Sequence, residues 1–342
     1  SNALDDYAAG LLGDRGFTAF EPRKPSTNPV AYDEAIKRLR DVQSRSLAVI
    51  TAKTVDSKNP DRLIGTSGEF GLGVIVSANG WVLTTSDELS SFQNPITGAE
   101  VWIRGVRYGI DEVVRDKLTP YVLLKLTDAS GLSPIGFGAS EDASNGDLVF
   151  VLPQALGFVP TAIENSESMM IDSPHAAETY ATAWKLAMSE PLRGPVISTA
   201  GDMLGFAMAA GDAVPLHHGL AFVQEVMRSG EAMHAALGAY TLDLSSVYNL
   251  SPDLRQGLST GELVIAPAGK LAVPIKTPAA EAGLLTHDII TAVDGEALTP
   301  TVSLSELLAT YDPGQTAKLS LLRAGAPIEI SVVLGDASLL IY

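Results

Sequence analysis

The amino-acid sequence predicts a mostly β protein, with an antiparallel barrel or sandwich first and a small α+β domain after it. The chain has 342 residues, enough for about two domains. Many short apolar or alternating runs fill the region 46–225, and Gly, Asn-Gly and Pro separate them without long helical periods. A second block over 236–336 alternates short strand and helix patterns.

The first elements follow from local spacing and turn residues. Residues 1–30 mix Gly, Pro and aromatics without periodicity, which indicates an N-terminal arm. From Tyr32 the spacing of Ile36 and Leu39 favours one face of a short helix. Asn79-Gly80 is the clearest hairpin turn, since both residues tolerate a positive φ. Strands are expected at 46–51, 71–76, 81–85, 100–104, 121–126, 148–152, 195–199 and 203–209.

A helix from Gln224 to about Ala236 is expected to lead into the second block. That block has expected strands at 262–267, 289–293, 317–323 and 328–334, and expected helices at 279–282 and 303–310. We therefore predict an arm and short helix at 1–40, a first domain at 41–228, a second domain at 236–336 and an apolar tail at 337–342.

Composition excludes several classes of function. Lys and Arg total 23 against 40 Asp and Glu, and the net charge of -17 repels phosphate backbones, so we expect no nucleic-acid partner. The chain has no Cys, which removes disulfides, thiolate metal sites and a cysteine nucleophile. We expect no cofactor and no metal. Ser1-Asn2-Ala3 resembles a tag-cleavage scar, which suggests that an upstream signal peptide or membrane anchor was removed.

Two segments of the first domain resemble the HtrA family of extracytoplasmic serine proteases. Residues 71–76 (GLGVIV) and 79–84 (NGWVLT) are similar to the G-S-G-V-I-I and D-G-Y-I-L-T hairpin of that family. The resemblance covers about 35–336. It implies a trypsin-like double antiparallel β-barrel followed by an α+β PDZ domain, located outside the cytoplasm as a periplasmic or cell-surface protein.

The same resemblance locates the family's catalytic positions, where this chain has other residues. Asp87 stands at the histidine position after the hairpin. Residues 118–126 (LTPYVLLKL) resemble T-D-L-A-L-L-K-I, with Pro120 in place of the Asp. Residues 190–196 (EPLRGPV) resemble G-N-S-G-G-P-L, with Leu192 in place of the nucleophile. Because this hydrolysis needs a hydroxyl, an imidazole and a carboxylate, we predict a degenerate triad and no enzyme activity.

Other residues offer few catalytic alternatives. Ser189 and Ser198 lie near the aligned nucleophile as possible displaced nucleophiles, although no motif supplies a base. His217-His218 would suit a metal, but side chains of neighbouring strand residues point to opposite faces. The alternative is a pair of surface histidines in a loop.

The second domain carries the most specific resemblance. Residues 277–284 (TPAAEAGL) and 288–296 (DIITAVDGE) resemble the PDZ signature S-P-A-A-x-A-G-L-x-x-G-D-x-I-x-x-I-N-G. PDZ domains add a peptide C-terminus to a strand edge and hold its carboxylate on a loop. By this resemblance the loop is Leu237, Gly238 and Ala239, followed by an edge strand of Tyr240, Thr241 and Leu242. The alternative is that Leu237 and Leu242 are core residues and the groove is closed.

These observations favour a non-catalytic peptide-binding scaffold or regulator in protein quality control, which takes peptide or protein C-termini through the PDZ domain. The resemblance implies a homo-oligomer, with a trimer favoured, or a hetero-oligomer with an active relative. Phe17 and Phe20 of the arm are candidate contacts. The alternative function is an HtrA-type serine endopeptidase with a non-standard or oligomer-assembled site. The apolar tail 338–342 would occupy a PDZ groove, form a final strand or mark an artificial end.

Overall fold

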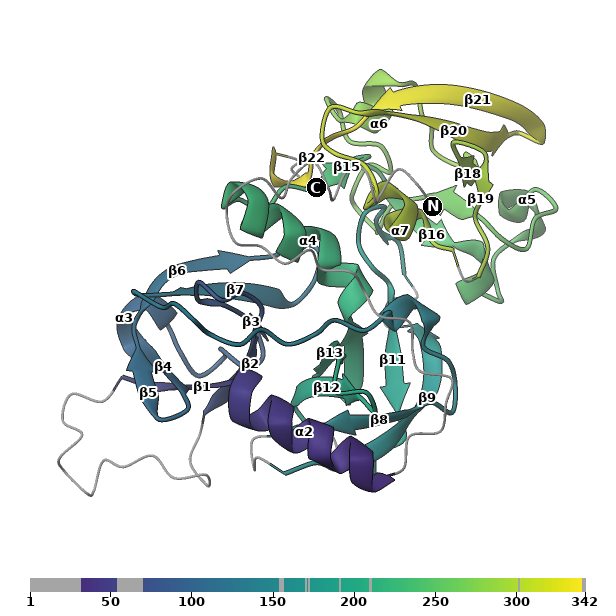
Figure 1. The fold of residues 1–342 in the computed structure, drawn as a ribbon. Coiled ribbons are helices and arrows are strands. Elements are labelled where there is room, and N and C mark those ends of the chain that lie inside the picture. Colours follow the sequence, from purple (N-terminus) through teal and green to yellow (C-terminus); the bar gives the residue numbers. More distant parts are fainter. Residues whose placement is uncertain are drawn as a thin grey trace. The chain divides into compact units, whose positions relative to one another are not determined.

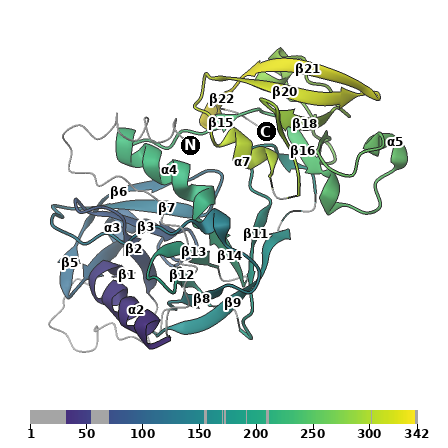
Figure 2. The same ribbon diagram turned by 45° about the vertical axis from the view of Figure 1, so that its right-hand side comes forward.

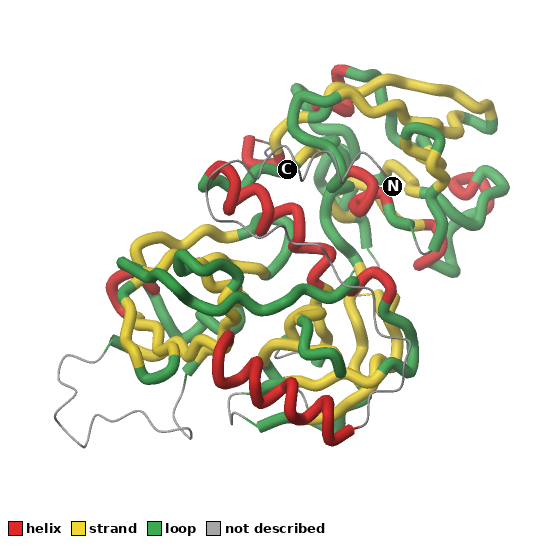
Figure 3. The backbone as a smooth tube through the Cα atoms, in the orientation of Figure 1, coloured by secondary structure: helices red, strands yellow, loops and turns green. Residues whose placement is uncertain are grey.

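The fold consists of two compact units (Figures 1 and 3). A computed structural model describes residues 32–53, 70–153, 157–169, 171, 173–190, 192–208, 211–300 and 302–339. The first unit comprises three parts of the chain: the residues up to Asp116, Pro120–Ser166 and Trp184–Gly230. The second takes Lys117–Thr119, Glu167–Ala183 and the chain from Glu231. The predicted arm with Phe17 and Phe20, and residues 340–342 of the tail, lie outside the described residues.

The first sheet of the first unit has seven antiparallel strands in the order β5-β4-β1-β2-β3-β7-β6. The amphipathic helix α2 (Tyr32–Ser46) leads into it, as predicted, and buries Leu39. Val76 N donates to Trp81 O at 2.9 Å across the turn at Asn79-Gly80, where Gly80 has a φ of 96°. The elements are β1 (Leu47–Ala52), β2 (Gly71–Ile75), β3 (Trp81–Thr85), α3 (Pro95–Gly98), β4 (Ala99–Ile103), β5 (Val106–Tyr108), β6 (Ile110–Arg115) and β7 (Tyr121–Leu126).

The second sheet of this unit is a closed barrel in the order β11-β14-β13-β12-β8-β9. Its core is built around the fully buried Trp184. The Tyr121 hydroxyl at the start of β7 donates to the Val214 carbonyl at 2.8 Å and so joins the two sheets. The elements are η2 (Ser140–Asp142), β8 (Leu148–Val151), β9 (Val159–Met169), β11 (Thr182–Leu186), β12 (Gly194–Ser198), β13 (Met203–Ala207) and β14 (Asp212–Pro215).

The helix after this barrel differs from the prediction. Helix α4 spans Leu216–Ser229, whereas the sequence indicated a start at Gln224 and an end near Ala236. It ends where Gly230 takes a left-handed φ of 85° and donates its N–H to Val226 O. The segment 234–236 is not helical, because β15 (Ala235–Ala236) pairs with β22 (Gly335–Asp336).

The second unit has a sheet in the order β10-β16-β17-β18-β20-β21, with β19 paired to β18. Figure 2 labels β16, β18, β20 and β21 of this sheet. The turn between β18 and β19 is formed by Asp294-Gly295, with φ values of 48° and 85°. Helix α7 has the predicted start, with Ser303 and Glu306 forming a capping box. The elements are β10 (His175–Ala176), β16 (Tyr240–Asp243), η3 (Leu244–Ser246), α5 (Pro252–Arg255), β17 (Glu262–Val264), α6 (Pro278–Glu281), β18 (Ile289–Val293), β19 (Glu296–Ala297), α7 (Leu304–Leu308), β20 (Thr316–Arg323), β21 (Ala326–Val333) and η4 (Ala337–Leu339).

The described part of the tail forms η4, and Ala337 N donates to His234 O at 2.9 Å. Of the helices in the described ranges, none combines the length and the apolar character needed to cross a membrane.

Candidate functional site

The three positions aligned with the family's catalytic residues lie together at strand ends of the first unit. Asp87 follows β3 and Pro120 precedes β7, and these strands are neighbours in the first sheet. Ser86 N donates to Pro120 O at 2.8 Å. Arg193 Nη1 donates to Asp87 O at 3.1 Å. This bond brings the start of β12, and Leu192 with it, to the same place.

The side chains at this place are held by buried hydrogen bonds. Asp87 and Leu192 are half-buried. The neighbouring Glu88 is 3% exposed, and its Oε2 accepts Leu72 N at 2.8 Å. The hydroxyl of Thr84 donates to Leu72 O at 2.6 Å. The turn after β3 is therefore fixed, and it presents a carboxylate at the position aligned with the histidine.

The two serines weighed as displaced nucleophiles have different environments. Ser198 Oγ accepts the N–H groups of Ala200 and Asp202, both at 3.2 Å, so it closes the turn between β12 and β13. Ser189 is exposed in the loop that leads into β12. Ser189 is therefore the accessible hydroxyl of the two.

A serine that the sequence analysis missed does meet an imidazole. Ser140 Oγ lies 3.0 Å from His217 Nδ1 and also accepts His217 N at 2.8 Å. Pro215, the N-cap residue of α4, has no side chain that can accept a hydrogen bond from the first turn of the helix. The Ser140 hydroxyl accepts one of these N–H groups instead. Because Ser140 is 2% exposed and bonded twice, its geometry is that of a helix cap.

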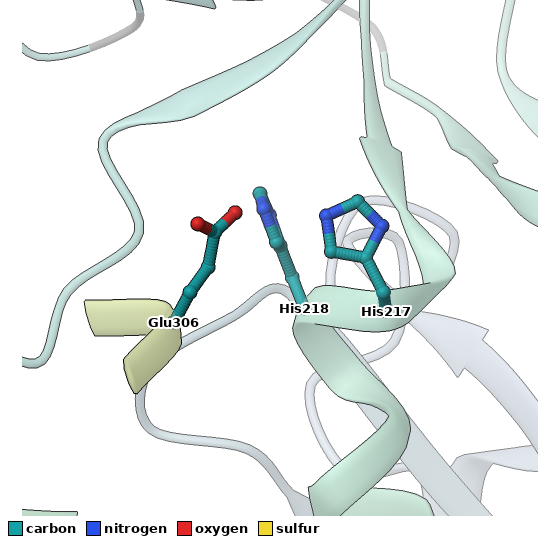
Figure 4. A group of neighbouring side chains, drawn as sticks. All are labelled: His217, His218 and Glu306. Carbon is teal, nitrogen blue, oxygen red and sulfur yellow. The ribbon is translucent and has the colours of Figure 1, made fainter. Parts of the chain in front are cut away.

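The adjacent histidines lie in a helix, which corrects the expectation of a surface loop. His217 and His218 form the first turn of α4 with their rings edge to face, 4.4 Å between centroids (Figure 4). His218 is 3% exposed. Glu306, also labelled in Figure 4, belongs to the second unit, where its carboxylate accepts Ser303 N at 2.9 Å.

The six residues predicted to bind a peptide follow β15 and continue along β16. Leu237, Gly238 and Ala239 connect the two strands, and Gly238 has a φ of 74°. All six are buried, and Leu237 belongs to the main hydrophobic cluster of this unit, as the alternative interpretation expected. The buried residues in β16 are Tyr240, Thr241 and Leu242.

The outer edge of β16 is already paired with a strand from the middle of the chain. β10 runs antiparallel to β16, with His175 opposite Thr241. Two residues further along, Ala177 N donates to Ala239 O at 2.9 Å. The sequence analysis missed this pairing because a strand of two residues has no periodic pattern.

Two buried carboxyl groups lie in the same unit. Glu178 is 2% exposed, and burial raises its pKa to about 7. The N–H groups of Leu237 and Gly238 are near enough to lower this pKa. Within the described chain, however, neither carboxyl oxygen has a partner at hydrogen-bond geometry. Burial and the charge of Asp243 raise the pKa of Glu262 to about 7. Both groups therefore change charge near neutral pH.

Comparisons with known proteins agree with this architecture. Residues 251–334 match the PDZ domain family. The periplasmic pH-dependent serine endoprotease DegQ of Escherichia coli (strain K12) is 24% identical over 288 residues, which cover 79% of this chain and 60% of the relative. A probable periplasmic serine endoprotease DegP-like from Bartonella henselae is 23% identical over 277 residues, covering 78% of this chain and 53% of the relative.

A similar solved structure is that of the HtrA-type protease AlgW with decapeptide. It has a TM-score of 0.61 at 21% identity, and the match covers 90% of this chain and 99% of that one. It confirms the predicted mostly β fold, trypsin-like barrels followed by a PDZ domain. The chain spans 60% and 53% of the two curated relatives.

The names of these relatives contradict one prediction, namely that the chain is not an enzyme. The relatives are serine endoproteases, so that prediction is wrong by this comparison. The prediction that the chain is not an enzyme depended only on the residue types at Asp87, Pro120 and Leu192. Residue types at aligned positions do not show which hydroxyl and which base meet in the active protein.

Proposed function

Because the chain is an HtrA-family protein with a C-terminal PDZ domain, we propose that it is a serine endopeptidase of the HtrA type with a non-standard site, and that its PDZ domain captures peptide C-termini. The peptide-binding residues are those of the predicted loop and edge strand, Leu237 to Leu242.

The observation that carries peptide capture is the strand added to β16. An extended segment can gain main-chain hydrogen bonds only where a strand edge accepts it. β16 accepts β10 in antiparallel register on the side opposite β17. Next to this edge, Gly238 has a left-handed φ of 74°, a conformation that anion-binding nests need at one of their residues.

Two findings support the endopeptidase. The relatives are named serine endoproteases. In addition, the ends of β3, β7 and β12 meet where the family has its active site, as the contacts of Asp87 with Arg193 and of Ser86 with Pro120 indicate. A nucleophile must come from outside the three aligned positions, and the exposed Ser189 is our candidate.

A cleavage assay tests the endopeptidase. The purified chain is incubated with casein and with a quenched fluorescent peptide, and Ser189→Ala is compared with the control Ser44→Ala, which alters another exposed serine, in helix α2. We expect the wild type and Ser44→Ala to cleave, and Ser189→Ala to lose at least about a thousandfold in kcat. No cleavage by the wild type would overturn the endopeptidase and leave peptide capture standing.

Location and assembly follow from the same relatives. We infer that the chain acts outside the cytoplasm, because the curated relatives are named periplasmic. We infer a homo-oligomer, with a trimer favoured by the family resemblance. Light scattering coupled to gel filtration measures the assembly directly, and a monomer at all concentrations would contradict it.

A further inference from the structure

The peptide edge of the second unit is covered by a segment of the same chain. Residues 173–178 lie in the chain between β9 and β11 of the closed barrel, but they belong to the second unit. Their strand β10 is the outermost strand of the sheet, directly beside β16. A captured peptide would be added at this same edge.

The side chain of Ala177 is buried in the hydrophobic core beside this edge. Ala177 is 2% exposed and belongs to the same buried cluster as Leu237 of the loop and Leu304 and Leu308 of α7. Its N–H donates to Ala239 O at 2.9 Å, so both its backbone and its side chain are engaged. The side chain that this segment buries in the cluster is therefore a single methyl group.

The next residue brings a carboxyl group to the loop. The Glu178 carboxyl group is almost fully buried, and neither of its oxygens has a hydrogen-bond partner among the described residues. The N–H groups of Leu237 and Gly238 are near enough to lower its pKa. Loops of this shape bind the terminal carboxylate of a peptide. Thr179 N donates to Ala176 O at 2.8 Å, so the chain turns away directly after the carboxyl group.

This arrangement imitates the end of a bound peptide: an antiparallel strand, then a small buried apolar side chain, then a carboxyl group near the loop. We propose that residues 173–178 are an internal ligand of the PDZ groove, which external peptides ending in a small apolar residue must displace. This inference rests on the proposed peptide capture. If the groove is open for only a fraction of the time, its apparent affinity for an external peptide is the intrinsic affinity multiplied by that fraction.

The experiment releases the segment without altering the groove. Ala177→Arg places a long cation in a buried apolar cluster, and Ser173→Arg adds the same side chain at an exposed position of the same segment. Ala177→Pro is a milder release variant, because it removes the N–H donor to Ala239 and keeps a small side chain. The probe is a fluorescein-labelled heptapeptide with the sequence of residues 171–177 and a free C-terminal carboxylate.

Fluorescence anisotropy measures probe binding by each full chain, and circular dichroism checks that each is folded. We expect both Ala177 variants to bind at least about tenfold more tightly than the wild type, and Ser173→Arg to bind like the wild type. Hydrogen exchange should show slow exchange at Thr179 in the wild type and fast exchange in the release variants.

Two results overturn the proposal, and they are distinguishable. If the wild type and the folded Ala177 variants bind the probe equally, the internal ligand is wrong and peptide capture stands. If none of the chains binds the probe although exchange shows the segment released, peptide capture itself fails, and β10 is only a permanent strand of the sheet.

Discussion

Replacing Glu178 by Gln should remove a pH dependence from the docking of β10. Gln keeps the shape of the side chain but does not ionise. In the wild type the pKa of Glu178 is raised from 4.5 to about 7 by burial, so the docked form holds a proton that a solvent-exposed Glu178 has already lost. Docking is therefore strongest below about pH 4.5 and weakens as the pH rises through 7.

The size of the effect follows from the two pKa values. The docked form is favoured by about 2.5 kcal/mol more at about pH 5 than at about pH 8, which corresponds to about seventyfold in the docking equilibrium. The figure applies to a side chain that is nearly fully buried, where solvent screening is small. In Glu178→Gln this difference should fall close to zero.

Hydrogen exchange at Thr179 and Ala177 measures the docking free energy through protection factors at both pH values. Glu262→Gln is the matched control, because Glu262 is also buried with a pKa of about 7 but lies on β17. Both variants should flatten the pH dependence of global unfolding in urea. Only Glu178→Gln should flatten the pH dependence of the protection factors at Thr179 and Ala177. An unchanged pH dependence of local protection in Glu178→Gln would refute the reasoning.

Three further substitutions test the packing around the sites by urea unfolding. Gly194→Ala should cost about 3 kcal/mol or abolish folding, because Gly194 has a φ of 139° and a Cβ would lie 1.9 Å from Leu152 O; a stable variant would show that β12 shifts freely. Gly219→Ala should cost about 1–3 kcal/mol, since its Cβ would lie 2.2 Å from the buried ring of Tyr121, and a neutral result would contradict this packing. Ser303→Ala should cost about 1 kcal/mol by removing the capping box of α7, whereas an unchanged midpoint would show that the cap contributes little.

The sequence predicted those features that depend on neighbouring residues. Asn79-Gly80 predicted a hairpin because its φ requirement is local, and the helix expected over 303–310 does start after Ser303. Helix α4 was placed too late, because the apolar spacing near Leu216 is interrupted by the histidine pair and Gly219.

The candidate site was only partly predictable. Leu237 to Leu242 were predicted through resemblance to a motif, and the structure has them in the loop before β16 and in β16 itself, whose outer edge pairs with β10. The partner of that edge lies about sixty residues earlier in the sequence, and neither His175 nor Ala177 carries a pattern that indicates it. No sequence pattern marks Glu178 either, because burial of a carboxyl group depends on tertiary contacts.

The position of β10 also affects how this protein can be divided. A fragment that starts at residue 231, where the last part of the second unit begins, would leave β16 as the outermost strand, with its row of N–H and C=O groups open to solvent. Such an edge pairs readily with another copy of itself. A fragment intended as an isolated PDZ domain would therefore tend to associate edge to edge, and fusing residues 173–179 to it through a flexible linker would restore the missing strand.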